Sequence, residues 1–198
     1  MLTILDAKSN LIEIKRSKFH GYIFHTENND QFDDALSRVK KEHPRADHIV
    51  YAYIHSKNEN GYSDANEPKG TAGRPVLNVL EKNSLCLVSL FIVRYFGGIK
   101  LGAGGLVRAY THTASDVINS CEKKSLLEAI TLIFTLKYEE LDRFLSQYKD
   151  GGLVILDKSF GEDVKIKAII KEGMLPSFKS DIRILSFNVI KKDFLYPF

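Results

Sequence analysis

The feature that most constrains the fold is the block from Arg94 to Tyr110, which joins three local patterns. The apolar run 85–96 predicts a strand buried on both faces, and apolar spacing from Leu106 to about Ser120 predicts an amphipathic helix. Five glycines occupy the nine positions 97–105 between them. Glycine is favoured where the backbone needs a positive φ or a close approach. The block therefore predicts a strand, a tight loop and a helix in direct succession.

The glycine loop lies in a locally positive stretch, because no acidic residue occurs between Glu81 and Asp116. The basic residues of that stretch are Lys82, Arg94, Lys100 and Arg108. A glycine loop that runs into a helix presents backbone N–H groups and the positive end of the helix dipole. The expected guest is an anion, namely a phosphate, a nucleic acid backbone or a carboxylate, and a structural turn is the alternative. The phosphate-loop and dinucleotide-binding signatures are both absent.

A second motif, Glu67 to Pro75, is either an ordered loop before a helix or a surface that joins the glycine loop in one groove. In the first interpretation Thr71 caps the helix and Glu67 pairs with Arg74. Asp64 and Glu67 are the carboxylates near the basic block. They are expected to balance positive charge; an acid–base pair or a Mg²⁺ site is the alternative.

The six histidines lack the clustered spacing of a zinc site. His48 follows Asp47 on a predicted strand, where adjacent side chains point apart. Nucleophile motifs such as Gly-x-Ser-x-Gly are absent. We therefore expect no metal, no cofactor and no catalytic residue, and we keep His48 with Asp64, Glu67 and Thr71 as secondary candidates for the site.

Composition indicates a globular protein, with 44% apolar and 27% charged residues and a net charge of +3. The longest apolar run, 85–93, is too short to cross a bilayer, and the N-terminus lacks a signal-peptide pattern. Two cysteines, Cys86 and Cys121, are expected to remain thiols. A cytoplasmic protein without membrane association is therefore expected.

Hydrophobic periodicity divides the chain into two α+β domains. Before the block, two strands are expected within 10–25, a helix over 32–39 with Asn29 or Asp30 as its cap, a strand over 48–54 and a short helix over 75–81. After residues 122–128 the order is β-α-β-β-(α)-β, with the last strand over 182–190. The predicted domains are 1–125 and 126–198.

Two stretches together carry a family resemblance. The segments Glu67-Pro68-x-Gly70-Thr71-Ala72-Gly73-Arg74-Pro75 and Arg94-Tyr95-Phe96-Gly97-Gly98-x-Lys100-Leu101-Gly102-x-Gly104-Gly105 closely resemble the signature of the YigZ/IMPACT family. The resemblance implies an N-terminal domain like domain 2 of ribosomal protein S5. It also implies a ferredoxin-like C-terminal domain similar to domain V of elongation factor G. Where the family tends to show Asp-Asp-Gly-Glu-Pro-Ser/Ala-Gly, this chain reads Asp64-Ala65-Asn66-Glu67-Pro68-Lys69-Gly70, which makes the groove more positive.

The leading hypothesis is an RNA- or ribosome-associated protein that regulates translation, and a protein partner is a further candidate, bound through the C-terminal domain. The expected phosphate contacts come from the basic residues and loop glycines of the two motifs: Arg74, Arg94, Gly97, Gly98, Lys100, Gly102, Gly104, Gly105 and Arg108. One alternative is an enzyme that binds a phosphorylated small molecule or nucleotide at Gly97–Gly105. Another is a protein-interaction module without an anion site.

Overall fold

The computed structural model describes residues 1–56, 58–148, 151–181 and 183–196, and the chain divides into two compact units, Met1–Ser125 and Leu126–Phe198. Among the described residues, no helix is both long and apolar enough to span a membrane.

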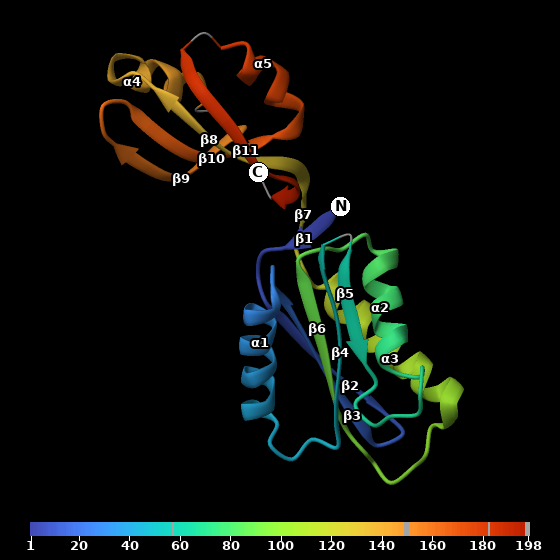
Figure 1. Ribbon diagram of the computed structural model, residues 1–198. Coiled ribbons are helices and arrows are strands. Elements are labelled where there is room, and N and C mark those ends of the chain that lie inside the picture. Colours follow the sequence, from blue (N-terminus) through green and yellow to red (C-terminus); the bar gives the residue numbers. More distant parts are fainter. Residues whose placement is uncertain (57, 149–150, 182, 197–198) are drawn as a thin grey trace. The chain divides into compact units, whose positions relative to one another are not determined.

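The first unit is built on a five-stranded antiparallel sheet with the strand order β2-β3-β6-β4-β5 (Figure 1). Helix α1 covers one face of this sheet, and α2 and α3 cover the other (Figure 1). The short strands β1 and β7 pair with each other. The elements are β1 (Leu2–Ile4), β2 (Lys8–Ile14), β3 (Ser17–His25), α1 (Asn29–Glu42), β4 (His48–Ser56), β5 (Glu59–Ser63), α2 (Gly73–Lys82), β6 (Val88–Tyr95), α3 (Gly102–Asn119) and β7 (Lys123–Ser125).

Strand β6 is the centre of this sheet, and every residue from Val88 to Arg94 is buried. Its alternate side chains face the two helical layers. Phe91 and Val93 pack with Phe32 and Val39 of α1, which leaves Leu90, Ile92 and Arg94 for the opposite face. The prediction of a strand buried on both faces is confirmed.

Helix α3 buries the apolar stripe that its sequence predicts. Its buried residues are Leu106, Ala109, Tyr110, Thr113, Ala114, Val117 and Ile118. The expected start at Leu106 was wrong, because the helix already begins at Gly102. Gly102, Gly104 and Gly105 therefore form its first turn, while Gly97 and Gly98 remain in the loop. Glycine is a poor helix former, and packing of α3 against β2 and β3 overrides that local preference.

Other helix ends also differ from the prediction. The N-cap of α1 is Asn28, whose side chain accepts a hydrogen bond from the Gln31 amide, rather than Asn29 or Asp30. The N-cap of α2 is Ala72, which makes no side-chain cap. Thr71 instead donates its hydroxyl to the Pro68 carbonyl at 2.6 Å, so it does not cap the helix.

The second unit is a four-stranded antiparallel sheet with the order β11-β8-β10-β9. Its elements are β8 (Leu127–Leu136), α4 (Tyr138–Gln147), β9 (Leu153–Phe160), β10 (Val164–Lys171), a 3₁₀ turn (Glu172–Met174), α5 (Leu175–Lys179) and β11 (Ile184–Tyr196). Phe134, Phe144 and Phe178 meet in its core, with ring centroids 5.0–5.8 Å apart. The strand expected from Ile182 begins instead at Ile184, and residue 182 lies outside the described residues.

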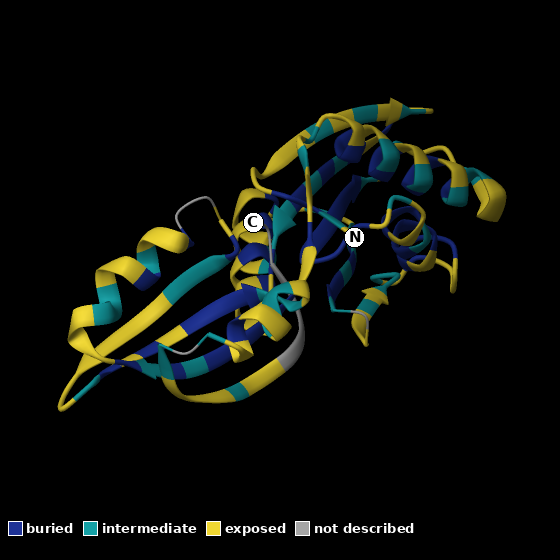
Figure 2. Ribbon diagram, turned by 90° about the horizontal axis from the view of Figure 1, so that it is seen from above, coloured by how far each residue is buried: buried dark blue, intermediate teal, exposed yellow. Residues whose placement is uncertain are grey.

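Burial follows this layered arrangement in both units. Dark blue marks the buried inner strands in Figure 2, whereas buried and exposed residues alternate along the helices. In α1 the buried positions are Phe32, Ala35 and Val39, which recur at helical spacing. Each helix therefore contributes one apolar face to a core and leaves the other in solvent.

Candidate functional site

The candidate site lies at one end of the first unit's sheet, on the face covered by α2 and α3. Three neighbouring strands meet there in register, since Arg94 of β6 is opposite His48 of β4 on one side and Phe19 of β3 on the other. The loop after β5 and the start of α3 complete the site. A cavity of about 340 Å³ opens here, lined by Glu67, Pro68, Arg94, Phe96, Lys100, Leu101, Gly102, Ala103 and Leu106.

A buried ion pair forms part of the cavity lining. Arg94 Nη1 donates to Glu67 Oε1 at 2.7 Å, and the two residues are 5% and 8% exposed. Tyr110 also donates its hydroxyl to Glu67 Oε1 at 2.7 Å. Burial, followed by the charge of Glu67, raises the pKa of Tyr110, so its hydroxyl keeps its proton at neutral pH. The predicted pairing of Glu67 with Arg74 is therefore wrong.

Arg94 is also enclosed by aromatic rings. Its guanidinium carbon lies 5.5 Å from the ring centroids of both Phe19 and Phe96. Among the described residues its Nε is buried without a hydrogen-bond partner. Arg94 thus belongs to the interior of the site, with its charge balanced by Glu67.

His48 and Asp64 hold the second motif in place. His48 Nδ1 lies 2.8 Å from the Ala65 carbonyl, and since a carbonyl only accepts, that nitrogen carries the proton. Its Nε2 is 3.8 Å from Glu67 Oε1. Asp64 accepts hydrogen bonds from the amides of Gly70, Ala72 and Gly73 at 2.8–3.1 Å. The Asp64 carboxylate therefore organises the loop before α2, which is a structural role.

The glycine loop is fixed by contacts that were not predicted from the sequence. The Phe96 amide donates to Asp47 Oδ2 at 2.8 Å, and the Gly97 amide donates to Ser17 Oγ at 3.1 Å. A Cβ on Gly97 would lie 2.0 Å from the Arg16 carbonyl carbon, so only glycine fits against the β2–β3 turn. Gly98 and Gly102 have φ of +80° and +71°. Long-range contacts of this kind leave no local signal in the sequence.

The remaining basic candidates lie at the surface. Lys100 and Arg108 are exposed, and no ion pair involves either of them in the described part of the chain. A Cβ on Gly104 would lie 3.6 Å from Arg108 Nη1, so the Arg108 guanidinium lies beside the first turn of α3. Arg74 is exposed too, and its Nη2 lies 3.7 Å from Glu81 Oε2. The structure thus brings Lys100 and Gly102 to the cavity with Glu67 and Arg94, whereas Arg74 lies outside the cavity lining.

The start of α3 has the features of an anion-binding helix end. No side chain caps it, and its first turn contains no acidic residue. The first amides of a helix have no partner within the helix, so this end combines free donors with the positive end of the dipole. Lys100 lies two residues before Gly102, the first residue of α3.

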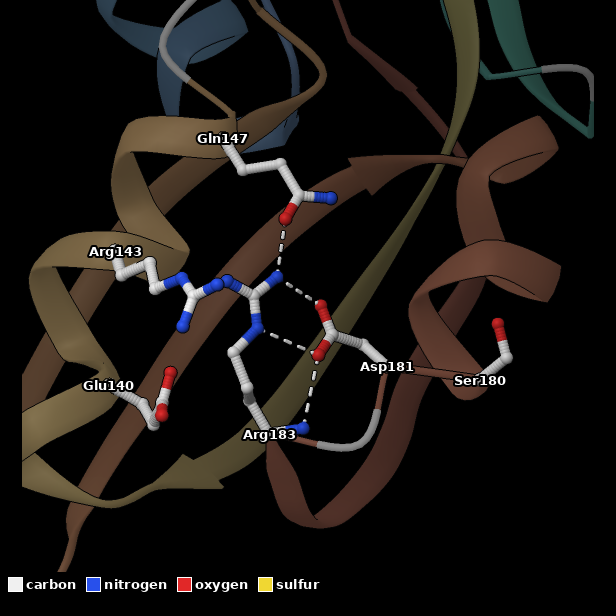
Figure 3. A pocket seen from close by; sticks show the side chains of 6 residues that line it. All are labelled: Glu140, Arg143, Gln147, Ser180, Asp181 and Arg183. Atoms are coloured by element: carbon white, nitrogen blue, oxygen red, sulfur yellow. Dashed lines mark hydrogen bonds and ion pairs between the residues drawn. The ribbon is translucent and has the colours of Figure 1, made fainter.

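A larger pocket of about 600 Å³ lies in the second unit (Figure 3). Its central guanidinium, that of Arg183, donates to Asp181 at 2.6 and 2.9 Å and also reaches Gln147. These hydrogen bonds lower the pKa of Asp181. The charge of Arg183 is thus neutralised by Asp181, and the lining also contains the acidic Glu140, which makes this pocket a weaker candidate for anion binding. The pocket is lined by Glu140, Arg143, Gln147, Ser180, Asp181 and Arg183.

No group of His, Cys, Asp and Glu side chains in the described ranges is arranged to hold a metal ion. Glu67 is paired with Arg94, and Asp64 is bound to backbone amides. Both carboxylates at this end of the sheet are therefore already engaged by protein donors.

Comparison with known proteins identifies the family. The model of the Impact N-terminal domain matches residues 15–118, which span the whole candidate site. This chain belongs to the IMPACT family. An IMPACT family member of Haemophilus influenzae is 33% identical, over 86% of this chain and 84% of the relative. YvyE, an IMPACT family member of Bacillus subtilis, is 30% identical over 96% of this chain and 93% of its own.

A solved structure of a hypothetical protein is also similar to this IMPACT family chain. It has a TM-score of 0.70 and 26% sequence identity, and the match covers 96% of this chain and 97% of the other. The similarity shows a shared fold. The residues of the cavity and of the glycine loop all lie within the matched family domain.

Proposed function

We propose that this IMPACT family protein binds RNA, free or within the ribosome, through the edge formed by Lys100 and the first turn of α3. The observation that supports it best is the charge arrangement at the cavity. Glu67 is the one carboxylate among the lining residues, and Arg94 neutralises it, so Lys100 and the helix end present uncompensated positive charge. Phosphate groups are the complementary ligands.

The neighbouring groups extend this edge. Arg108 lies one helical turn after Gly104 and its guanidinium reaches back beside it, and Phe96 and Ile99 of the glycine loop are 46% and 42% exposed. Basic groups that track a phosphate backbone, together with exposed aromatic rings on which bases stack, are the usual elements of a single-stranded RNA site. Arg74 contributes less, because Glu81 lies close to it.

The cellular role that we propose is regulation of translation in the cytoplasm, as the family resemblance implies. We also propose that the first unit is like domain 2 of ribosomal protein S5 and the second is ferredoxin-like. Support for the latter is the element order β-α-β-β-α-β and the strand order β11-β8-β10-β9. Exposed apolar side chains on the second unit, Leu156 and Phe160 among them, suit contact with a protein partner.

The test is binding of labelled single-stranded RNA, tRNA and ribosomes across a salt series. Lys100→Glu places a negative charge at the helix end, and we expect it to weaken binding at low salt and to flatten the salt dependence. Lys40→Glu is the matched control, because Lys40 is exposed on α1, at the opposite face of the sheet. We expect Lys40→Glu to bind like the wild type.

Two results would contradict the proposal. One is the absence of binding to any of these RNAs at low salt. The other is an equal loss of affinity in Lys100→Glu and Lys40→Glu, which would indicate attraction by net charge alone.

The second candidate function is an enzyme that acts on a phosphorylated small molecule or nucleotide. The cavity itself favours it, since about 340 Å³ is within the range of small-ligand pockets, roughly 300–1,000 Å³. Such an enzyme would turn over a phosphorylated metabolite in the absence of RNA, and Glu67→Gln would abolish that turnover. A screen of phosphorylated metabolites for turnover by the wild-type protein and Glu67→Gln decides between the two.

A further inference from the structure

The cavity beside Lys100 suits a ligand group other than a phosphate, because most of its lining is apolar. The apolar members of its lining are Pro68, Phe96, Leu101, Ala103 and Leu106. Its volume of about 340 Å³ lies at the small end of the range for ligand pockets, roughly 300–1,000 Å³. A phosphate group has no apolar surface to place against these side chains. The cavity thus suits one flat, partly apolar group attached to a phosphate.

The two charged residues that pair across the cavity lining, Glu67 and Arg94, each have hydrogen-bonding capacity that their printed partners do not use. The hydrogen bonds to the Glu67 carboxylate found among the described residues both reach Oε1, from Arg94 and from Tyr110, and Oε2 receives neither. On the donor side, Arg94 Nε is buried and has no hydrogen-bond partner within the described part of the chain. A buried donor without a partner is costly, and a ligand acceptor removes that cost.

One wall of the cavity is a stacking surface. Phe96 is 46% exposed although it lies in a loop pinned by the hydrogen bond from its own amide to Asp47. The Arg94 guanidinium lies 5.5 Å from its ring centroid. Aromatic rings and guanidinium planes are the surfaces on which proteins stack unpaired RNA bases.

We propose that this cavity holds one unpaired nucleobase of the bound RNA, with guanine preferred, while Lys100 and the first turn of α3 hold the adjoining phosphate. The inference rests on the RNA binding proposed above and names the part of the RNA that is recognised. In this arrangement the ring of the base stacks on Phe96, and the polar edge of the base faces the Glu67–Arg94 pair. The charge of the phosphate faces Lys100 and the start of α3.

Guanine fits the polar groups better than uracil does. Its Watson–Crick edge carries two adjacent N–H donors, which suit a carboxylate, next to the O6 acceptor, which suits an arginine N–H. Uracil offers one N–H between two carbonyl oxygens, so it would place an acceptor against the Glu67 carboxylate. The uracil carbonyl oxygen and the Glu67 carboxylate repel each other, so specificity comes mainly from weaker binding of uracil.

The experiment compares binding of GMP and UMP by calorimetry, because the two nucleotides share a phosphate and differ in the base. We expect GMP to bind at least about fivefold more tightly than UMP to the wild-type protein. Two variants test the cavity without altering its charges. Ala103→Leu fills it from the exposed first turn of α3, and Phe96→Ala removes the stacking wall. Both are expected to abolish the preference for GMP.

The same protein samples are then titrated with single-stranded RNA across a salt series. Ala103→Leu is expected to keep the wild-type salt dependence, because it leaves every basic residue in place. Lys40→Glu is again the control, and it is expected to retain both the preference for GMP and the RNA binding.

The outcomes separate the two proposals. Equal binding of GMP and UMP, no binding of either, or a preference that persists in both cavity variants overturns the nucleobase pocket, while salt-dependent RNA binding that needs Lys100 leaves the proposed function intact. The absence of RNA and ribosome binding at low salt overturns the proposed function, whatever the mononucleotides do.

Discussion

At the residue scale, Arg94 and Lys100 line the same cavity but serve different purposes. Arg94 is buried against Glu67, so Arg94→Ala leaves a carboxylate without its cation and is expected to lower stability by about 3 kcal/mol. Lys100 is exposed, so Lys100→Ala is expected to change stability by no more than about 0.5 kcal/mol. Urea denaturation of both variants measures the difference. Equal stability of the two would contradict the structural role of the ion pair.

His55 is expected to make the first unit sensitive to acid. Its ring is buried against Tyr53, with centroids 4.6 Å apart, and burial lowers the pKa of His55 below 6.5 although Glu59 opposes the shift. As the pH falls, His55 therefore becomes protonated at a higher pH in the unfolded chain than in the folded protein. Stability that is present above about pH 6.5 is lost as the pH falls toward the lowered pKa of the folded protein.

Replacing His55 tests this linkage. We expect His55→Leu to show a smaller loss of unfolding free energy than the wild type between about pH 7.5 and 5, as measured by urea denaturation. His20, whose pKa burial also lowers, remains in both proteins and contributes to the residual slope. An unchanged slope in His55→Leu would rule out a contribution from His55.

Some residues that line the cavity, Glu67, Arg94 and Lys100 among them, were candidates from the sequence, but the contacts of those residues could not be predicted. From the excess of basic residues around the glycine loop, Arg94 and Lys100 were both expected to contact phosphate. Arg94 is buried because of the register of β3, β4 and β6 and because the loop that carries Glu67 packs against it, whereas Lys100 stays exposed. Ser17 and Asp47 were missed because their role is to receive amide hydrogen bonds from a distant loop.

At the scale of elements, the glycines of the block do two different things. Gly98 has a φ of +80°, so Gly98→Ala is expected to lower stability by about 1 kcal/mol. Gly104 lies inside α3, and the nearest atom to an added Cβ is 3.6 Å away, so Gly104→Ala is expected to raise stability by about 0.5–1 kcal/mol. Chemical denaturation measures both. Destabilisation by Gly104→Ala would contradict the assignment of this glycine to the helix.

Elements with strong periodicity could be predicted, and their ends could not. The stripe on α3 and the apolar run of β6 both reflect burial, which the sequence pattern records directly. The start of α3 depends on glycines that disfavour a helix locally and are held there by packing. The cap of α2 likewise depends on Asp64, whose hydrogen bonds to the amides of Ala72 and Gly73 bridge eight and nine residues.

At the scale of the whole molecule, each unit has its own aromatic core. Phe144 packs with Phe134 and Phe178 in the second unit, and Phe144→Ala is expected to cost that unit about 3–5 kcal/mol. Hydrogen exchange should then show lost protection over 126–198 and native protection over 1–125. Loss of protection in both units together would contradict their division into two compact bodies.

The proposed RNA site lies on the first unit, at the glycine loop and the start of α3. Its most direct test is a titration of the isotopically labelled protein with a short single-stranded RNA, followed by backbone amide resonances. We predict shifts concentrated in residues 96–106 and in the loop 64–72, with α1 and strands β9 and β10 unaffected. Shifts confined to the second unit or to α1 would contradict the account.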